Sequence, residues 1–292
     1  MFERILVPLD GSELAERALP YAGAIAKRLG SEVVLLTVSG PGDCVERPLR
    51  AYLEKRADEL LSPRAKASSL VLEGDAAEEI LNLAETNYVD LIVISTHGCS
   101  GSSRWPVGSI AGKVLLRSHT PTLLVKPGAP ETALDEIELR RILVALDGSH
   151  FAESIIPCVE GLAVGMSSEV SLLRVVEPVR LPRLDAYGHW DDLEKYEKDL
   201  STEAEKEAER YLSGQGLALR QKGVSVTSSV VSGPPAEVLL QYAEDHDVSL
   251  IALSTHGYSG ITRWAYGSVA SRIVEGSSRP VLLVRPEASP GD

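Results

Sequence analysis

The sequence predicts an α/β protein made of two tandem copies of one domain, each a five-stranded parallel sheet of strand order 3-2-1-4-5 with helices on both faces. The chain has 292 residues, more than one hydrophobic core usually organises. Its second half repeats the first, at an offset of 137 residues where Arg4 aligns with Arg141 and of 159 where Ser95 aligns with Ser254. Short apolar runs alternate with amphipathic helical segments, as right-handed βαβ units require.

The strands are predicted from runs rich in Val, Leu and Ile without polar alternation, which is typical of strands covered on both faces. In the first copy these runs lie at residues 4–9, 32–38, 69–72, 90–94 and 122–126. The second copy repeats the pattern, beginning with "RILVALDGS" at 141–149 against "RILVPLDGS" at 4–12.

Helical segments fill the intervals between these runs. The first is predicted to begin at Ser12, which can cap its first turn, and to end at Gly30. Its apolar stripe consists of Leu14, Ala18, Ala22, Ile25 and Leu29. Further helices are expected at 49–64, at 76–86 behind Asp75 with Glu78 in the capping-box position, and at 109–117.

The domain boundaries follow from the repeat. The segment "PGAPETALDEIEL" has Pro, Gly and acidic residues and no core-like periodicity, so it is predicted to be a linker. We place domain 1 at 1–127, the linker at 128–140 and domain 2 at 141–292. The second copy has an insertion around 177–200 that begins Pro-rich and becomes helical, with Tyr196, Leu200, Ala204 and Ala208 in step. A longer crossover is favoured over a lid.

Composition and charge limit the partners. Apolar residues make up 44% and charged residues 24%, an ordinary globular balance. The formal net charge of −13 would repel nucleic acid and an anionic bilayer, so neither is expected as a partner. The opening apolar run is too short for a signal peptide and no run reaches about 18 apolar residues, so a cytoplasmic location is expected.

The three cysteines show no pattern that predicts chemistry. Cys44, Cys99 and Cys158 have neither paired spacing nor a neighbouring His cluster, which argues against a disulfide framework or a structural zinc site. Cys99 aligns with Tyr258, which argues against thiol chemistry shared by the two copies.

One stretch of fifteen residues occurs twice, as "STHGCSGSSRWPVGS" at 95–109 and "STHGYSGITRWAYGS" at 254–268. In an open parallel sheet, ligands bind beyond the carboxyl ends of the strands, where neighbouring crossovers leave toward opposite faces. Strand one ends at Asp10 or Asp147, and strand four runs into the repeated stretch. The two features are therefore expected to meet at one cleft in each half.

The repeated stretch has the features of a phosphate cradle. Gly98 lets the backbone approach an oxyanion, and Gly108 and Ser109 open a helix whose unpaired amides and positive dipole end point to the same place. The second copy repeats the arrangement with Gly257, Gly267 and Ser268. Neither a Walker loop nor a GxGxxG motif is present, because Lys113 lies inside the helix at the wrong spacing and no glycine-rich turn follows strand one.

Structural explanations stay open for these residues. The glycines can serve a tight loop, Ser109 can cap its helix, and Asp10 and Asp147 can cap the first helix of each half. Loop hydrogen bonding is favoured over catalysis for His97 and His256, which have no triad or metal-ligand spacing around them. The middle of the repeated stretch carries an arginine followed by a tryptophan in both halves, Arg104 with Trp105 and Arg263 with Trp264. The arginine can bind a phosphate group, and the tryptophan can pack the loop against the rest of the protein.

Over nearly its full length the chain resembles a tandem universal stress protein. The ATP-binding subgroup of that family carries Gly-x-x-Gly, nine residues, then Gly-Ser or Gly-Thr, with an Asp at the end of strand one. Here the later elements are present in both halves, while Ser95 and Ser254 replace the first Gly. The resemblance implies a Rossmann-like fold of the adenine nucleotide alpha hydrolase-like kind that binds ATP, accompanied by Mg²⁺.

The resemblance also implies which residues contact the nucleotide, residue by residue. In the first half they are Pro8, Leu9, Asp10, Val38, Ile94, Ser95, Gly98, Gly108, Ser109 and Ile110. In the second half they are Ala145, Leu146, Asp147, Val175, Leu253, Ser254, Gly257, Gly267, Ser268 and Val269. No metal-ligating side chain and no catalytic residue is assigned.

Three functions compete at this point. The first is a cytoplasmic stress-response or regulatory protein that binds ATP in one or both halves. The second is a slow ATPase or phosphotransferase, which the sequence supports less because no base or metal carboxylates accompany the cradle. The third is a nucleotide-free scaffold whose last strands, "PTLLVKP" and "PVLLVRP", pair the halves within the chain or form a homodimer.

Overall fold

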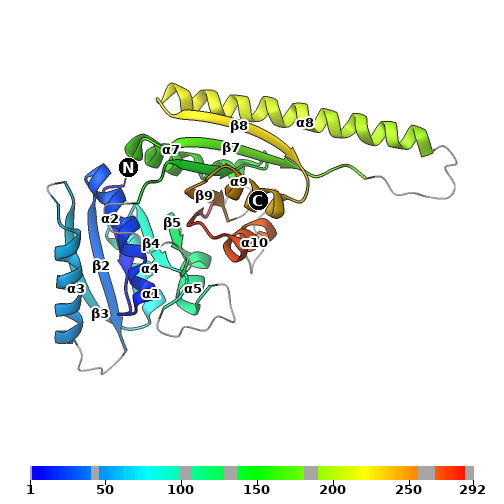
Figure 1. Ribbon diagram of the computed structural model, residues 1–292. Helices are drawn as coiled ribbons and strands as arrows, with labels where there is room; N and C mark the ends of the chain where they lie inside the picture. The colour runs from blue at the N-terminus through cyan, green and yellow to red at the C-terminus, as the bar shows by residue number, and fades with distance from the viewer. Residues whose placement is uncertain are drawn as a thin grey trace.

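The computed structural model of the chain describes residues 2–40, 46–62, 64–98, 107–127, 137–180, 190–255 and 267–286. Within these ranges, ten strands form one continuous sheet of order β3-β2-β1-β4-β5-β10-β9-β6-β7-β8 (Figure 1). The strands of the first half are β1 (Arg4–Pro8), β2 (Glu32–Ser39), β3 (Lys66–Glu73), β4 (Leu91–Ser95) and β5 (Thr122–Val125). Those of the second are β6 (Arg141–Ala145), β7 (Glu169–Val176), β8 (Ser225–Ser232), β9 (Leu250–Ser254) and β10 (Val281–Val284).

The predicted order 3-2-1-4-5 is confirmed in each half, with parallel pairing throughout. The two halves join where β5 pairs with β10 in the antiparallel sense, with Leu123 opposite Leu282. Both last strands therefore have a neighbour on each side inside one chain. Because the halves run in opposite directions, the carboxyl ends of their strands lie at opposite edges of the sheet.

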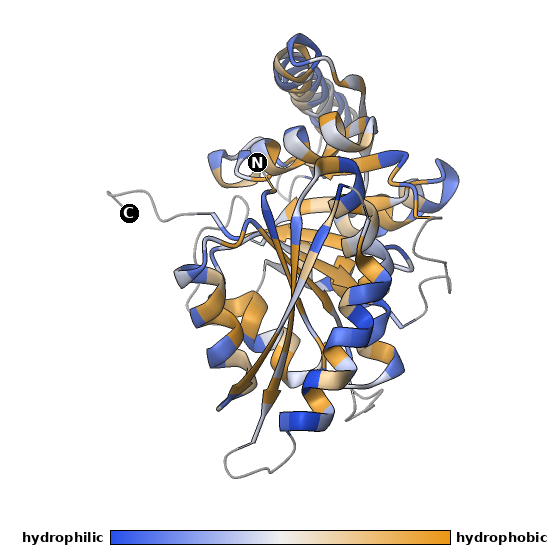
Figure 2. Cartoon of the chain, turned by 90° about the vertical axis from the view of Figure 1, so that its left-hand side faces the viewer, coloured by the Kyte–Doolittle hydropathy of each residue, from blue (hydrophilic) through white to orange (hydrophobic). Residues whose placement is uncertain are grey.

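The helices of the first half are α1 (Glu13–Glu16), α2 (Ala18–Leu29), α3 (Glu46–Leu60), α4 (Ala76–Thr86) and α5 (Ser109–Arg117). The second half has α6 (His150–Glu153), α7 (Ile156–Met166), α8 (Trp190–Gln221), α9 (Pro235–Asp245) and α10 (Ser268–Gly276). Successive strand residues point to opposite faces, so Ile5 and Val7 join the core under α2, α3, α7 and α8, whereas Leu6 joins the core under α4, α5, α9 and α10. Figure 2 shows the resulting layers, with apolar strands between helices whose outer faces are polar.

The first predicted helix is not continuous, which corrects the expectation of one helix from Ser12 to Gly30. It breaks at Arg17 between α1 and α2, and the second half breaks in the same place between α6 and α7. The cause is Pro20 and its counterpart Pro157. Each lacks the N–H that would bond to the carbonyl four residues earlier, and its ring crowds that carbonyl. Gly30 then ends α2 in the left-handed conformation, at φ 78°.

The helix α8 forms the crossover from β7 to β8 in the second half and includes the last described residues of the insertion. Its 32 residues span about 48 Å, whereas the eight residues of β8 span only about 26 Å. The helix packs through Ala208, Leu212 and Leu219, which are buried. Its first turns project beyond the carboxyl end of β8 (Figure 1).

The halves also cap each other's helices. Lys126 Nζ, just after β5, donates to the carbonyl of Glu275 near the end of α10 at 3.0 Å. In the matching position of the second half, Arg285 donates to the carbonyl of Leu116 near the end of α5. Burial lowers the pKa of Lys126. These cations satisfy carbonyls that a helix end leaves without partners and complement its negative dipole end.

Candidate functional site

A cavity of about 140 Å³ lies at the carboxyl end of β1 and β4, between the sheet and the helices α4 and α5. All of the residues predicted for the first half line it, from Pro8, Leu9 and Asp10 on β1 and its loop to Gly108, Ser109 and Ile110 at the start of α5. Val38, Ile94, Ser95 and Gly98 complete the set. The fold therefore brings together four segments that are far apart in the sequence.

A second cavity of about 280 Å³ occupies the matching place in the second half. It is lined by Ala145, Leu146, Asp147, Val175, Leu253, Ser254, Gly267, Ser268 and Val269. The remaining predicted residue, Gly257, lies outside the described residues, as do His256 and the loop residues Arg104, Trp105, Arg263 and Trp264.

Sequence reasoning missed further apolar residues that line each cavity. From the helices these include Ala15, Ala76, Ile80 and Ala111 in the first half and Ala152, Pro235, Leu239 and Ala270 in the second, and the second strands add Leu36 and Leu173. One sequence signal could have located part of this lining, because a glycine follows the third strand of each half, at Gly74 and Gly233, and the next helix begins two residues later. In the structure these glycines have φ of 153° and 149°. The rule that sites lie at carboxyl ends applies to that loop as well.

Asp10 is held in a fixed orientation beside Gly98. Its Oδ1 accepts hydrogen bonds from the Ser12 amide at 3.0 Å and the Ser12 hydroxyl at 2.6 Å. A Cβ at Gly98 would lie 2.0 Å from the Asp10 Oδ2, so only glycine lets this backbone approach the carboxylate. In the second half, Asp147 Oδ1 accepts from the Ser149 amide at 2.8 Å.

The aspartates do not cap the first helix, which settles one alternative from the sequence. Ser12 is the N-cap of α1, since its hydroxyl accepts from the Ala15 amide at 3.2 Å. Ser149 does the same for α6 through the Ala152 amide at 3.1 Å. Asp10 and Asp147 instead accept hydrogen bonds from these serines, and both aspartates line their cavities.

The helices α5 and α10 begin without a side-chain cap. Their N-cap residues are Gly108 and Gly267, neither of which carries a capping side chain, and Ser109 and Ser268 are the first helical residues. The N-caps are tied to the ends of the fourth strands, because the Gly108 amide donates to the Thr96 carbonyl at 2.6 Å and the Gly267 amide to the Thr255 carbonyl at 2.8 Å. Both helices thus direct uncapped first-turn amides and a positive dipole end into a cavity.

Ser95 and Ser254 end the fourth strands and are 5% and 7% exposed. They line the two cavities at the position where the ATP-binding subgroup has its first glycine. His97 follows at the rim, with its Nδ1 3.0 Å from the Thr96 hydroxyl. This contact fits the expected role in loop hydrogen bonding.

The described part of the chain has no group of three or more His, Cys, Asp or Glu residues arranged to hold a metal ion. It also contains no helix long and apolar enough to cross a membrane. Cys158 is buried in α7, and burial raises the pKa of its thiol to about 12. Cys44 and Cys99 lie outside the described residues.

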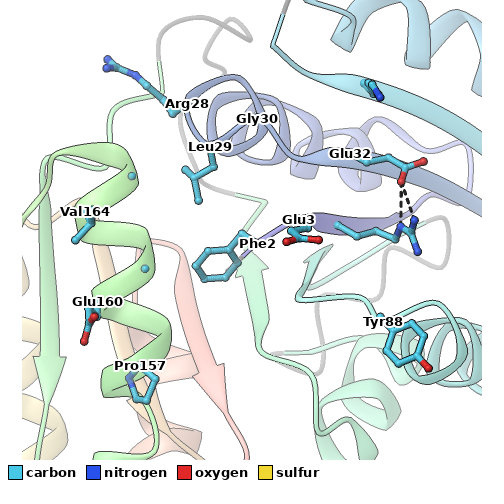
Figure 3. Close-up of a pocket in the computed structure, with 14 residues that line it drawn as sticks. Phe2, Glu3, Arg28, Leu29, Gly30, Glu32, Tyr88, Pro157, Glu160 and Val164 are labelled. Carbon is cyan, nitrogen blue, oxygen red and sulfur yellow. Dashed lines mark hydrogen bonds and ion pairs between the residues drawn. The ribbon is translucent and has the colours of Figure 1, made fainter.

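A wider groove of about 1300 Å³ lies elsewhere, at the amino ends of β1, β2 and β3. Figure 3 shows Phe2 and Leu29 facing the α7 residues Pro157 and Val164 across it. Its charges are mixed, and Arg4 pairs with Glu32 at 3.0 Å. The starts of α5 and α10 do not line this groove, so their first-turn amides do not face it.

A comparison with protein families decides what kind of chain this is. The model of the universal stress protein family matches residues 1–126 and, a second time, residues 138–285. The chain belongs to the universal stress protein family. Each half corresponds to one family domain, so this universal stress protein is a tandem member.

Curated relatives agree with that assignment. Universal stress protein Slr1230 of Synechocystis is 22% identical over 321 residues, covering 97% of this chain and 100% of the relative. Universal stress protein YxiE of Bacillus subtilis is 29% identical over 145 residues, which cover 50% of this chain and 98% of YxiE.

Solved structures share the fold over nearly the whole chain. A universal stress protein from Archaeoglobus fulgidus has a TM-score of 0.68 at 20% identity, covering 98% of this chain and 99% of that one. The functionally unknown protein PA1789 from Pseudomonas aeruginosa has a TM-score of 0.69 at 18% identity, covering 98% and 93%. At these identities the likeness concerns the fold alone.

Proposed function

We propose that this universal stress protein binds an adenine nucleotide, ATP accompanied by Mg²⁺, in the cavity of each half and acts as a cytoplasmic stress-response or regulatory protein. The observation that carries the proposal is the pair of uncapped helix starts at Gly108 and Gly267, each opening into a cavity at the carboxyl edge of its sheet. Such a start attracts an anionic group through its unpaired amides and its dipole.

The phosphate tail is proposed to lie against the first turn of α5 or α10. The amides of Ser109 and Ile110, or of Ser268 and Val269, would donate to phosphate oxygens, and the serine hydroxyl would add one more donor. Charge-assisted hydrogen bonds of this kind are shorter and stronger than neutral ones. Mg²⁺ is carried by the phosphates, because it prefers hard oxygen ligands and keeps several waters when it binds beside a nucleotide.

The base and ribose are proposed to fill the enclosed part of each cavity. Apolar side chains such as Val38 and Ile80 offer a slot for a flat ring, and the Asp10 carboxylate offers an acceptor for ribose hydroxyls. The cavity volumes, about 140 and 280 Å³, fall below the range of about 300–1,000 Å³ that is usual for whole ligands. The phosphates therefore lie at the open side, where the helix starts are.

Thermal unfolding with and without nucleotide tests the proposal. A ligand at 100 times its Kd stabilises the native state by about 2.7 kcal/mol, so ATP with Mg²⁺ should raise the Tm of the wild type. The double variant Gly108→Val, Gly267→Val places a branched side chain at both helix starts and should lose that shift. An equal Tm shift in the wild type and the double variant would count against the assigned site.

A further inference from the structure

The two cavities of this protein differ in the charges of the helices that begin beside them. Resting on the nucleotide sites proposed above, we propose that the second cavity selects a triphosphate over a monophosphate more strongly than the first does. The residue that makes the difference is Arg272 on α10. Its counterpart in the first half is Lys113 on α5, at the offset of 159 residues that relates the two loops.

Both cations occupy the same position relative to a proposed phosphate site. Each follows the first residue of its helix by four positions, Ser109 for Lys113 and Ser268 for Arg272. Residues four apart share one face of a helix, and their side chains tilt toward the helix N-terminus. Each cation therefore lies one turn behind the amides that would hold the phosphate tail.

In the first half the cation already has a partner. Lys113 Nζ lies 3.3 Å from Oδ2 of Asp75, which is the N-cap of α4. The next residue, Ala76, lines the first cavity, so one member of this ion pair directly precedes a lining residue. The amides of Glu78 and Ala77 and the Lys113 ammonium hold the pKa of Asp75 below its usual range, which keeps this carboxylate ionised beside Lys113.

In the second half the carboxylate is missing. The N-cap of α9 is Pro234, where the first half has Asp75, and the next residue, Pro235, lines the second cavity. Among the described residues, no ion pair or hydrogen bond engages the exposed guanidinium of Arg272. Its charge therefore remains available to an anion at the start of α10.

The other charged residues at the starts of these helices also make the first half more negative than the second. In the first half, Glu78 on α4 is paired with Arg117 on α5, and Glu79 lies one residue further along. The matching residues of the second half are Glu237, Gly276 and Val238. Over the N-cap and first turn of the fourth helix and the first five residues of the next, the charges sum to −2 in the first half, from Asp75, Glu78, Glu79 and Lys113, and to zero in the second, from Glu237 and Arg272.

A charge near the phosphate tail discriminates between nucleotides, because a triphosphate carries more negative charge at that place than a monophosphate. The ion pair of Lys113 is exposed, and exposed pairs are weak, so a ligand can compete for Lys113 at a small cost. The expected difference in the ATP-to-AMP affinity ratio between the two sites is therefore about fivefold, the size of one solvent-exposed charge contact at about 4 Å.

Titration calorimetry with ATP, ADP and AMP in single-site backgrounds tests this inference. Gly108→Val leaves the second site and Gly267→Val leaves the first. In the Gly108→Val background, Arg272→Gln should lower the ATP-to-AMP affinity ratio about fivefold, and Arg272→Lys should restore most of it. In the Gly267→Val background, Asp75→Asn should raise the ratio, since Asn still caps α4 but leaves Lys113 unpaired.

The control is Lys206→Gln, which removes one exposed positive charge on α8, away from both cavities. It should leave both ratios unchanged. Raising the salt concentration should reduce the effect of Arg272→Gln, because exposed charge contacts are screened. If the second site binds ATP but Arg272→Gln leaves the ratio unchanged, the inference is wrong and the proposed function stands. If the wild type binds no adenine nucleotide, both are wrong.

Discussion

Replacing Gly98 by alanine should disable the first cavity through Asp10. The new Cβ would lie 2.0 Å from Oδ2 and 3.0 Å from Cγ of the Asp10 carboxyl group. Non-bonded heavy atoms normally stay about 3.5 Å apart, so the carboxylate must move by more than about 1 Å. That movement breaks its hydrogen bonds to the amide and hydroxyl of Ser12. These two exposed hydrogen bonds contribute about 0.5–1.5 kcal/mol, so the free energy of unfolding should fall by that amount.

The assay for Gly98→Ala combines urea unfolding with ATP titration in the Gly267→Val background, where only the first site is left. The displaced carboxylate no longer faces the ribose, so the Kd for ATP should rise at least about tenfold. Gly112→Ala is the matched control, because a Cβ at Gly112 meets nothing within 4 Å. It should keep ATP binding and stabilise α5 by about 0.5–1 kcal/mol. Unchanged stability and unchanged ATP binding in Gly98→Ala would refute the reasoning.

Three further outcomes are expected. Cys158 is buried and has a pKa of about 12, so it should resist iodoacetamide at pH 8 in the native protein and react in urea. Equal rates of Cys158 labelling in the native and the unfolded state would contradict its burial. Lys126→Met should lower the free energy of unfolding, measured in urea, by about 1–2 kcal/mol, because the carbonyl of Glu275 near the end of α10 loses its donor from the other half. An unchanged free energy of unfolding would mean that this hydrogen bond between the halves contributes nothing. Ser12→Ala and Ser149→Ala should each lower the free energy of unfolding by about 0.5–2 kcal/mol, because each removes an N-cap. The loss should be larger for Ser12→Ala, because the Ser12 hydroxyl also donates to Asp10. A larger loss for Ser149→Ala would contradict that account.

The positions of the strands and the helix start at Ser109 could be predicted because they depend on local patterns. Apolar runs, a Gly-Ser pair and a repeat at constant offset each carry their signal within a few residues. The break at Arg17 was also readable, since Pro20 removes one helical hydrogen bond, but the apolar stripe through Leu14 and Ala18 continued across it. Hydrophobic periodicity indicates which face of a helix is buried, and it gives no sign that a proline lacks the N–H of one helical hydrogen bond.

Contacts between distant segments were not predictable in the same way. The approach of Gly98 to Asp10 depends on how two loops meet above the sheet, and the bond from Lys126 to Glu275 depends on the antiparallel pairing of β5 with β10. The sequence did suggest that the last strands pair, because they are short, apolar and flanked by prolines. It could not choose between pairing inside one chain and pairing between two.

The central claim is that the first-turn amides of α5 and α10 hold the anionic tail of an adenine nucleotide. A crystal structure of the wild type grown with ATP and Mg²⁺ tests it most directly. The claim predicts phosphate oxygens about 2.7–3.2 Å from the amide nitrogens of Ser109 or Ser268. Nucleotide bound instead in the groove between Phe2 and Val164, with both helix starts in contact only with water or with the chain's own side chains, would contradict it.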